Sequence, residues 1–542
     1  MKRFGKKLSL MIAAAFAMML LPGCGADSAE RAKELNMRIS TPPTTIDAQL
    51  VADTMSSTVV RFFTSTLYEY NLNRELVPAL AESSEVSDDG LTVTYHLREG
   101  LQWSNGSPIT ADDFVYSFER LVDPATKSGA VYLVTDCCLI ANAVKISKGE
   151  LPVSELGVSA PDKLTFVIDL EKPCPYINSL ISVCTFAPCS REFVNSCGSS
   201  YATSPETVIS CGPYVLDRYE PLASQIHLSP NEKYYDRSDD ITRTGVNLQV
   251  IGDAQQAIMC YETGMLDILG VSGELADLAE GDDHLMKFST AQIYRIDINH
   301  NSNRFTQNLN IRRAIAKSID RESIATNVIR SGYTALERVI PKYFYTDANG
   351  IDFAADQQLY AEQMGYDPEK AAEYWQEGLK ELGESSASLD FVYSASQAKI
   401  AEPIARQLET NLSGLELKLI PLPDKEWLRR VSVGDKYDII MDSWVPDYID
   451  PTALFTTCLG SGDDNMYAGS EFRELYDKSL SASGAERDKI LDQAEKQLMD
   501  DVALIPLFSG ERQYIVGDGV SGLQVTPTGV EMIITGLKKE VG

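Results

Sequence analysis

The sequence predicts an α/β protein that is divided into two or three lobes. Its 542 residues exceed what a single hydrophobic core usually serves. Stretches in which apolar and polar residues alternate, as in strands, occur between stretches whose apolar residues recur at helical spacing. Apolar residues make up 44% of the chain and charged residues 23%, which is the composition of an ordinary globular protein.

Residues 1–23 are typical of an export signal. Four cations among residues 2–7 precede an apolar segment, Leu8 to Leu21, that is too short to span a membrane stably. The segment ends on Leu21-Pro22-Gly23-Cys24, which resembles the lipobox of bacterial lipoproteins, although Pro22 is uncommon there. The resemblance implies that Cys24 becomes the lipidated first residue of the mature chain and that residues 24–36 form a polar tether. The alternative is plain secretion, with Cys24 incidental.

Downstream of Leu21 no apolar run approaches the roughly 18 residues of a membrane-spanning helix. We therefore expect a protein that is lipid-anchored to the extracytoplasmic face of the cell membrane. The formal net charge of −30 argues against nucleic acid as a partner and against electrostatic adhesion to anionic lipid. We expect a monomer without a cofactor.

Several elements near the N-terminus can be predicted in order. Met37 to Thr41 alternates as a short strand, and residues 91–97 alternate as a half-buried strand. Asn105-Gly106 is a tight-turn signal. Thr110-Ala111-Asp112-Asp113 is a capping box, in which the Thr110 hydroxyl accepts from the first helical amides and the Asp113 side chain accepts from the backbone amide of Thr110. A helix with a buried apolar stripe is expected after it.

Later helices are expected at Asn310–Ile319, Pro368–Leu382 and Glu486–Met499. In the last of these, Ile490 and Leu498 fall on one apolar face. The alternation of strands with such helices is typical of an α/β fold.

The stretch from Tyr437 to Pro451 reads Y-D-I-I-M-D-S-W-V-P-D-Y-I-D-P. It begins as a strand and is expected to break at Pro446 into a loop that holds Trp444, Asp447, Tyr448 and Asp450. Loops at strand ends often carry binding groups, because a rigid scaffold holds them toward a cleft. An indole would supply an apolar wall, and a carboxylate beside it would attract a ligand cation. The alternative is a capped turn over the core.

Nine cysteines follow Cys24, and four of them fall between Cys184 and Cys211. For an exported chain, one or two disulfides in that interval are expected. The Cys184-x4-Cys189 spacing differs from that of a zinc knuckle, and the chain contains only four histidines. We therefore expect no metal site.

Short motifs offer a weak case for catalysis. The penicillin-binding set S-x-x-K, S-x-N and K-[ST]-G is matched at residues 396–399, 229–231 and 127–129, but in reversed chain order. The sequence contains no H-E-x-x-H, no G-x-S-x-G and no P-loop. We expect that the protein is not an enzyme.

A run of residues 86–118 carries a specific resemblance. It reads V-S-D-D-G-L-T-V-T-Y-H-L-R-E-G-L-Q-W-S-N-G-S-P-I-T-A-D-D-F-V-Y-S-F and resembles the signature of the extracellular solute-binding proteins, family 5, the oligopeptide- and dipeptide-binding proteins of ABC importers. Further segments are similar to that family in the same order, and they are Gly212-Pro213-Tyr214, residues 231–235, 310–321 and 366–371, and Tyr437–Pro451. The resemblance covers nearly all of the chain after residue 37.

The resemblance implies an α/β fold of the periplasmic-binding-protein-like type II class, with three lobes and a hinged ligand cleft. The boundaries that it implies are a signal at 1–23, a tether at 24–36, lobe I from 37–64, 186–290 and 509–542, lobe II from 65–185 and lobe III from 291–508.

The resemblance also implies ligand-binding residues. Asp447 corresponds to the carboxylate that pairs with the α-ammonium of a peptide, and Trp444 to a wall of the first side-chain pocket. Trp427 corresponds to a second tryptophan that lines a pocket. The chain departs from the family after D-P-A-T-K-S, where Tyr132 stands at a shifted position and either substitutes for the family's tyrosine or leaves that contact absent.

The implied function is a lipid-anchored receptor that captures oligopeptides and delivers them to the permease subunits of an ABC importer. The alternatives are a receptor of the same family for a non-peptide solute, such as an oligosaccharide, a nickel chelate or haem, and a signalling lipoprotein without a transporter. Asp447 within W-x-x-D-Y favours a peptide, since a free N-terminus is the cation that nearly all peptides share.

Overall fold

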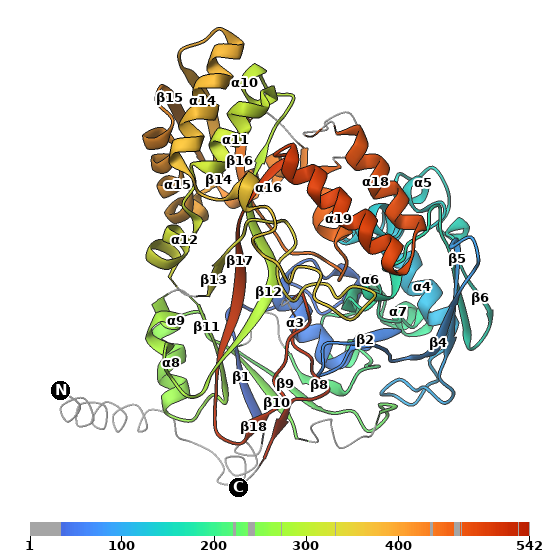
Figure 1. Cartoon of the computed structure of the whole chain (residues 1–542). Helices are drawn as coiled ribbons and strands as arrows, with labels where there is room; N and C mark the ends of the chain where they lie inside the picture. Colours follow the sequence, from blue (N-terminus) through green and yellow to red (C-terminus); the bar gives the residue numbers. More distant parts are fainter. Residues whose placement is uncertain are drawn as a thin grey trace, which may run out of the picture.

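The computed structural model describes residues 34–219, 224–236, 244–272, 274–330, 332–433, 437–459, 467, 469–528 and 531–540. The predicted signal and Cys24 lie outside the described residues, as does most of the predicted tether. Figure 1 shows the whole chain, in which a long central sheet connects two regions and a smaller sheet lies to one side.

The central sheet is mixed and has a strand order that is far from the chain order. Its strands, from one edge to the other, are β15 (Leu415–Leu422), β14 (Ala387–Ser394), β16 (Ile439–Trp444), β12 (Leu285–Ile298), β17 (Leu504–Val516), β11 (Ile268–Val271), β1 (Leu35–Ile39), β10 (Val246–Val250), β9 (Gln225–Pro230) and β8 (Tyr214–Arg218), with β13 (Tyr333–Ala335) paired to β17. The β14–β15, β14–β16, β1–β10 and β1–β11 pairs are parallel.

The strands β12 and β17 join the two ends of this sheet. They pair antiparallel along most of their length, and Figure 1 shows both running from the β11 region to the β16 region. The register shifts between Ser289 and Ile293 and again after Tyr294. Such bulges bend a strand and increase its twist locally, so the two strands change direction where the two parts of the sheet meet.

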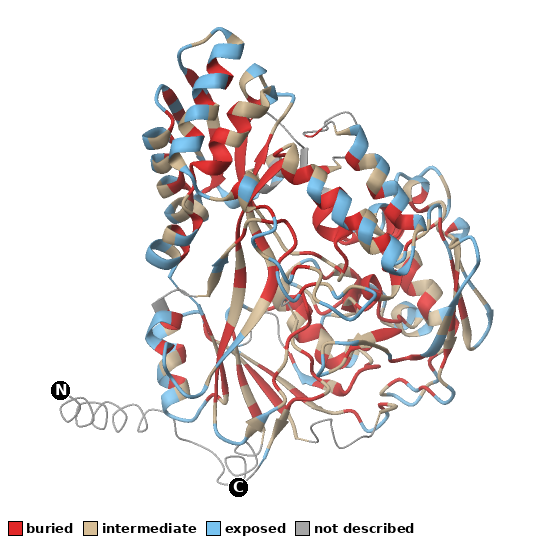
Figure 2. Ribbon diagram, in the orientation of Figure 1, coloured by how far each residue is buried: buried red, intermediate tan, exposed pale blue. Residues whose placement is uncertain are grey.

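Helices cover the sheet near both of its ends. At the end formed by β14 to β16 they are α10 (Arg304–Gln307), α11 (Leu309–Lys317), α12 (Arg321–Ile324), α14 (Pro368–Leu382), α15 (Ala398–Asn411) and α16 (Asp424–Val433), and near β11 they are α8 (Ala254–Glu262) and α9 (Glu274–Ala279). Figure 2 shows that these helices are buried on the side toward the sheet and exposed on the other. This is the pattern of amphipathic helices on a sheet.

The smaller sheet is antiparallel with the order β4 (Ala81–Val86), β5 (Thr92–Leu97), β7 (Thr165–Asp169) and β6 (Val158–Asp162). It packs against α4 (Ala111–Val122), whose Phe114 and Phe118 both contact Phe166 of β7. Two further strand pairs are short: β2 (Tyr68–Tyr70) pairs with β3 (Leu76–Pro78), and β18 (Val520–Ser521) pairs with β19 (Lys538–Lys539). The other described α-helices are α3 (Thr54–Phe63), α5 (Ala143–Ser147), α6 (Ile177–Leu180), α7 (Arg191–Cys197), α13 (Ala361–Met364), α17 (Thr452–Phe455), α18 (Ser470–Ser481) and α19 (Gly484–Asp500).

The buried apolar residues form separate cores. The largest cluster joins side chains from residues 67–211 with side chains from residues 291–508. A second cluster lies around β1, α3 and β8 to β10 and takes in residues from the C-terminal segment after β17. The C-terminal segment therefore packs into the same cluster as the N-terminal strand β1.

Several predicted elements are confirmed. The helix predicted at Pro368–Leu382 has those bounds, and the capping box between Thr110 and Asp113 begins α4. The strand predicted at residues 37–41 is found at Leu35–Ile39, so the predicted tether ends earlier than residue 36. Trp444 is the last residue of β16, where it pairs with Ile293, and it does not lie in the loop as predicted.

The expected disulfides between Cys184 and Cys211 are absent, because the structure leaves all nine described cysteines as thiols. The Cys184 thiol lies 3.5 Å from the hydroxyl of Ser57. The Cys211 thiol instead donates to the carbonyl oxygen of Ser65, at 3.5 Å. These thiols lie in the core against different partners, and burial raises the pKa of each of them.

Within the part of the chain that the structure describes, no helix has the length and apolar character needed to cross a membrane. In the same part, no three side chains of the types His, Cys, Asp and Glu come together in a way that could hold a metal ion.

Candidate functional site

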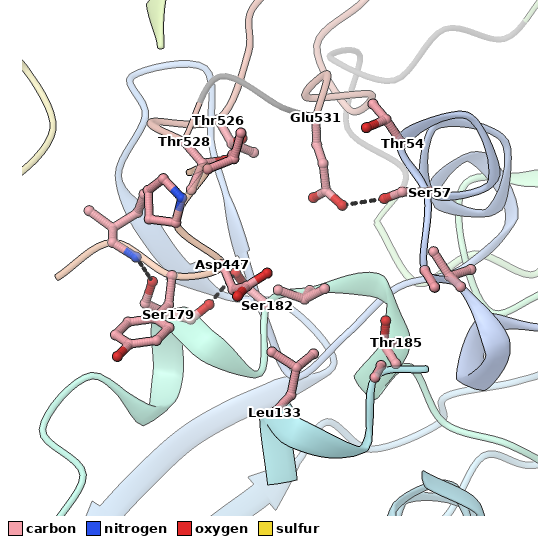
Figure 3. Close-up of a pocket in the computed structure, with 18 of the residues that line it drawn as sticks. Thr54, Ser57, Leu133, Ser179, Ser182, Thr185, Asp447, Thr526, Thr528 and Glu531 are labelled. Atoms are coloured by element: carbon pink, nitrogen blue, oxygen red, sulfur yellow. Dashed lines mark hydrogen bonds between the residues drawn. The ribbon is translucent and has the colours of Figure 1, made fainter. Parts of the chain in front are cut away.

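A cavity of about 420 Å³ lies where segments from distant parts of the chain meet. This volume falls within the usual range of small-molecule sites, roughly 300–1,000 Å³. Its wall is formed by the start of α3, the segment before the π-helix η2 (Leu133–Cys137), the turns after α6, the loop after β16 and the C-terminal segment. Figure 3 shows that many of the lining side chains carry hydroxyl groups, and they include Thr54, Ser57, Ser179, Ser182, Thr185, Thr526 and Thr528.

Asp447 and Tyr132 meet at this cavity. The Tyr132 hydroxyl donates a hydrogen bond to Oδ1 of Asp447 at 2.9 Å, across 315 positions of sequence. Tyr132 directly precedes η2, and Asp447 follows Pro446 in the loop after β16. The structure therefore brings together two of the residues that the sequence singled out, and both line the cavity.

The carboxyl group of Asp447 is a weaker acid than that of an ordinary aspartate. Its pKa is raised to about 6, because burial and, to a smaller extent, the negative charge of Glu531 raise the pKa by more than the hydrogen bond from Tyr132 lowers it. Among the described residues, no cation forms an ion pair with Asp447. A carboxylate that loses hydration without gaining a positive partner is costly in its charged form. The unliganded site therefore favours the arrival of a cation next to Asp447.

A second carboxylate, Glu531, lies on the opposite wall of the cavity, as Figure 3 shows. Its Oε1 accepts a hydrogen bond from the Ser57 hydroxyl at 2.5 Å, and its Oε2 pairs with Arg61 at 2.8 Å. Burial opposes the charge of Arg61, but Glu531 and Glu69 more than offset it, so the pKa of Arg61 is raised. Glu531 is thus already paired with a cation. A third carboxylate of the wall, Asp53, is the N-cap of α3 and accepts from the amide and the hydroxyl of Ser56. Asp447 is therefore the carboxylate best placed to meet a ligand cation.

The loop that carries Asp447 is anchored by its neighbours. The ring of Tyr448 stacks on Tyr176, with centroids 4.2 Å apart. Asp450 is buried and accepts two hydrogen bonds from Arg487 of α19, at 2.8 and 2.9 Å. Its Oδ1 also accepts from the amide and the hydroxyl of Thr452. These contacts fix the part of the loop that follows Asp447.

The strand before this loop is also more buried than alternation predicts. Residues 439–442 are all buried, since the sheet is covered on both faces there. Asp442 tolerates this position because Arg295 of β12 pairs with it at 2.7 Å. The rigid strand and the anchored loop together hold Asp447 at the cavity.

The two predicted tryptophans lie elsewhere. The indole of Trp444 donates to the carbonyl oxygen of Ala453 at 3.2 Å and packs against the large core. The indole of Trp427, on α16, donates to the carbonyl oxygen of Met441 at 3.0 Å and packs against a small cluster that includes Tyr437. Neither belongs to the wall of the cavity around Asp447. Their predicted role in side-chain pockets stays a prediction.

Sequence reasoning missed the opposite wall of the site. Glu531 and the threonines at 526 and 528 come from a segment in which no motif was recognised, and Ser57 sits in the first turn of α3. One signal was available at α3, where Asp53 precedes a helical stretch as a typical N-cap and accepts from the amide of Ser56 at 2.9 Å. No comparable local signal marks the C-terminal segment.

Comparison with known proteins identifies the class to which this fold and cavity belong. Residues 75–466 match the family described as "Bacterial extracellular solute-binding proteins, family 5 Middle". The chain belongs to this family of solute-binding proteins, and it has their α/β type II periplasmic-binding fold.

Individual relatives are similar over nearly their whole length. The chain is 28% identical to the dipeptide-binding protein of Lactococcus lactis subsp. cremoris, over 97% of this chain and 98% of that protein. It is 26% identical to the oligopeptide-binding protein OppA of Bacillus subtilis, over 94% and 93%. Among solved structures, OppA of Listeria monocytogenes bound to peptide is 29% identical and covers 94% of this chain and 99% of that chain, with a TM-score of 0.73.

Proposed function

We propose that this protein captures oligopeptides on the extracytoplasmic side of the membrane and delivers them to the permease subunits of an ABC importer. The observation that carries the proposal is the carboxyl group of Asp447, which lines a cavity without a cationic partner among the described residues. A peptide N-terminus would supply that cation. The related proteins named for dipeptides and oligopeptides support the same ligand class.

The role of each residue follows from this geometry. The Asp447 carboxylate binds the ligand's α-ammonium, and Tyr132 orients the carboxylate through its hydroxyl. The hydroxyl groups around the cavity can donate or accept, so they can bind backbone amides without selecting a side chain. A fixed carboxylate binds the charge that peptides share, so it does not select among their sequences.

We also propose the three-lobed organisation with the boundaries given above. The cores support the separation of lobe I, since the β1 region has a cluster of its own, apart from the cluster that joins residues of 67–211 with residues of 291–508. The long strands β12 and β17 connect the lobes and provide the hinge about which the cleft closes on ligand.

The function is tested by calorimetry with one peptide in two forms, with a free and with an acetylated N-terminus. We expect the free form to bind and the acetylated form to bind far more weakly, because acetylation removes the cation. Equal affinity for the two forms would contradict the proposal. Native mass spectrometry of the purified protein would identify any ligand retained from the cell.

The pH dependence of peptide binding gives a second prediction. The pKa of Asp447 is raised to about 6, so below that pH the carboxyl group is protonated and must release its proton to bind an ammonium group. Affinity should therefore fall by up to about tenfold per pH unit as the pH drops below about 6. The unliganded protein has the opposite dependence: the stability that protonated Asp447 contributes is present at low pH and is lost as the pH rises through about 6.

Isothermal titration at several pH values, in buffers of different ionisation enthalpy, measures both the affinity and the proton release. In Asp447→Asn the slope between pH 5 and 7 should disappear. A wild-type affinity that is constant over this range would mean that Asp447 does not contact the ligand's charge.

Anchoring gives a third prediction, which rests on the lipobox-like Leu21-Pro22-Gly23-Cys24. We expect Cys24→Ser to release the protein from the membrane, because a single thiol carries the proposed lipid. Cell fractionation followed by high-salt and carbonate washes measures this. Cys197→Ser, at a partly exposed cysteine of the folded body, is the matched control and should stay in the membrane fraction. Retention of both variants would contradict lipidation at Cys24.

A further inference from the structure

A second cavity, of about 820 Å³, adjoins the cavity of Asp447. The two cavities share Tyr70, Ser179 and Ile449 in their walls. The Ser179 hydroxyl accepts a hydrogen bond from the amide of Ile449 at 2.7 Å and lies 2.8 Å from the hydroxyl of Tyr70. The second cavity is therefore the adjoining space into which a ligand longer than the first cavity extends.

The wall of the second cavity is rich in aromatic rings. Five rings and two prolines line it, and they are Tyr70, Tyr176, Tyr343, Phe344, Tyr345, Pro175 and Pro527. Charged groups are also present, but the buried carboxylate of Asp450 is paired with Arg487, as described above. The cavity of Asp447 is instead lined by many hydroxyl groups. The two cavities therefore suit different parts of a ligand.

Three of the rings are held in place by contacts within the protein. Tyr176 stacks on Tyr448, with centroids 4.2 Å apart. Phe344 is only 3% exposed. The Tyr345 hydroxyl donates a hydrogen bond to Oδ1 of Asp488 at 3.2 Å. These rings are fixed parts of the wall, and they leave a preformed apolar surface on one side of the cavity.

Tyr343 differs from them, because its side chain lines the cavity and is still 57% exposed. Its φ is 65°, in the left-handed region that a bulky residue seldom adopts. The amide of Tyr343 donates to Oδ2 of Asp352 at 3.1 Å, and Asp352 itself pairs with Thr346 across the turn that follows. The ammonium group of Lys342 lies 5.0 Å from the ring centroid. The fold thus keeps a strained backbone that presents an exposed ring at a cavity, and such strain is often associated with functional sites.

We propose that the second cavity is a subsite for an aromatic side chain of the ligand held at Asp447, and that the ring of Tyr343 contacts that side chain. The proposal rests on the proposed function. Two aromatic rings attract each other in stacked or edge-to-face arrangements by more than the burial of their area. An aliphatic side chain gains only the burial. The subsite therefore gives a preference among peptides that the Asp447 carboxylate, which binds a charge common to them, does not provide.

The test uses an alanine pentapeptide in which one position at a time carries phenylalanine or cyclohexylalanine, whose saturated ring has nearly the same size. At one position after the first, wild type should bind phenylalanine about 2- to 10-fold more tightly than cyclohexylalanine, the range for an aromatic pair. Tyr343→Ala should lose this preference, and Tyr343→Phe should retain it. Calorimetry measures the affinities.

Ile351→Ala is the matched control. Ile351 is also 57% exposed and lies in the turn after Tyr343, but it does not line the second cavity. The control variant should therefore keep the preference of wild type. Thermal melting of every variant verifies that it folds, and an exposed side chain such as Tyr343 should contribute little to stability.

The outcomes separate this proposal from the proposed function. If phenylalanine and cyclohexylalanine bind equally at every position, while acetylation of the N-terminus still abolishes binding, the subsite is wrong and the proposed function stands. A preference that is confined to the first position, or that persists in Tyr343→Ala, also overturns the subsite at Tyr343. If acetylation has no effect on any of these peptides, the proposed function fails, and the subsite that rests on it fails as well.

Discussion

Asp447→Asn should weaken peptide binding by about 2–5 kcal/mol, the range for removing one side of a buried, hydrogen-bonded charge pair. The change keeps the volume of the side chain, and an amide oxygen can still accept the hydrogen bond from Tyr132. The effect should therefore come from the lost charge and not from lost packing. Calorimetry on the variant and the wild type measures it.

The decisive measurement is a double cycle that combines this variant with acetylation of the ligand. Asp447→Asn should discriminate much less than wild type between the free and acetylated forms of a peptide. Asp136→Asn, at an exposed residue of η2, is the matched control and should leave both affinities unchanged. A coupling energy near zero would show that Asp447 does not bind the ligand's ammonium group.

Elements with strong local signals could be predicted from the sequence almost to the residue. The helix α14 begins at Pro368 after the N-cap Asp367, whose side chain accepts from the amide of Lys370 at 2.9 Å. It ends before Gly383, whose φ of 70° suits a helix terminus. All of these signals lie within one short segment, so no knowledge of distant contacts is needed.

The site could be predicted only in part, because it depends on contacts between distant segments. Asp447 and Tyr132 were each singled out, but nothing in the sequence states that the hydroxyl of one meets the carboxylate of the other. Glu531 reaches Ser57 over 474 positions, and no motif marks either residue. The predicted loop position of Trp444 was wrong, because β16 continues through Trp444, which still pairs with Ile293 of β12.

The two aspartates of D-Y-I-D-P also have different roles, which the motif alone does not distinguish. Asp447 lines a cavity without a cation, whereas Asp450 is only 3% exposed and is bound by Arg487. One is available to a ligand, and the other holds the loop to α19. Substituting them separately therefore distinguishes binding from stability.

Asp450→Asn should lower the free energy of unfolding by about 3–5 kcal/mol, because it leaves the buried guanidinium of Arg487 without its negative partner. Arg487 is itself buried, and its Nε also donates to the carbonyl oxygen of Ser479, at 2.9 Å, which carries no full charge. The amide of the new asparagine can still accept one hydrogen bond, but it cannot balance the charge. Denaturant unfolding of the unliganded protein measures the loss.

The matched control is Asp477→Asn, which breaks the pair between Asp477 and Lys172. Those side chains are 62% and 56% exposed, so the pair is solvated and should contribute less than about 1 kcal/mol. Asp447→Asn should likewise leave the stability near that of wild type at neutral pH or raise it, since it removes a desolvated charge. If Asp450→Asn were as mild as Asp477→Asn, the pair with Arg487 would not be what anchors the loop, and the position of Asp447 would have to depend on the stacking of Tyr448 on Tyr176.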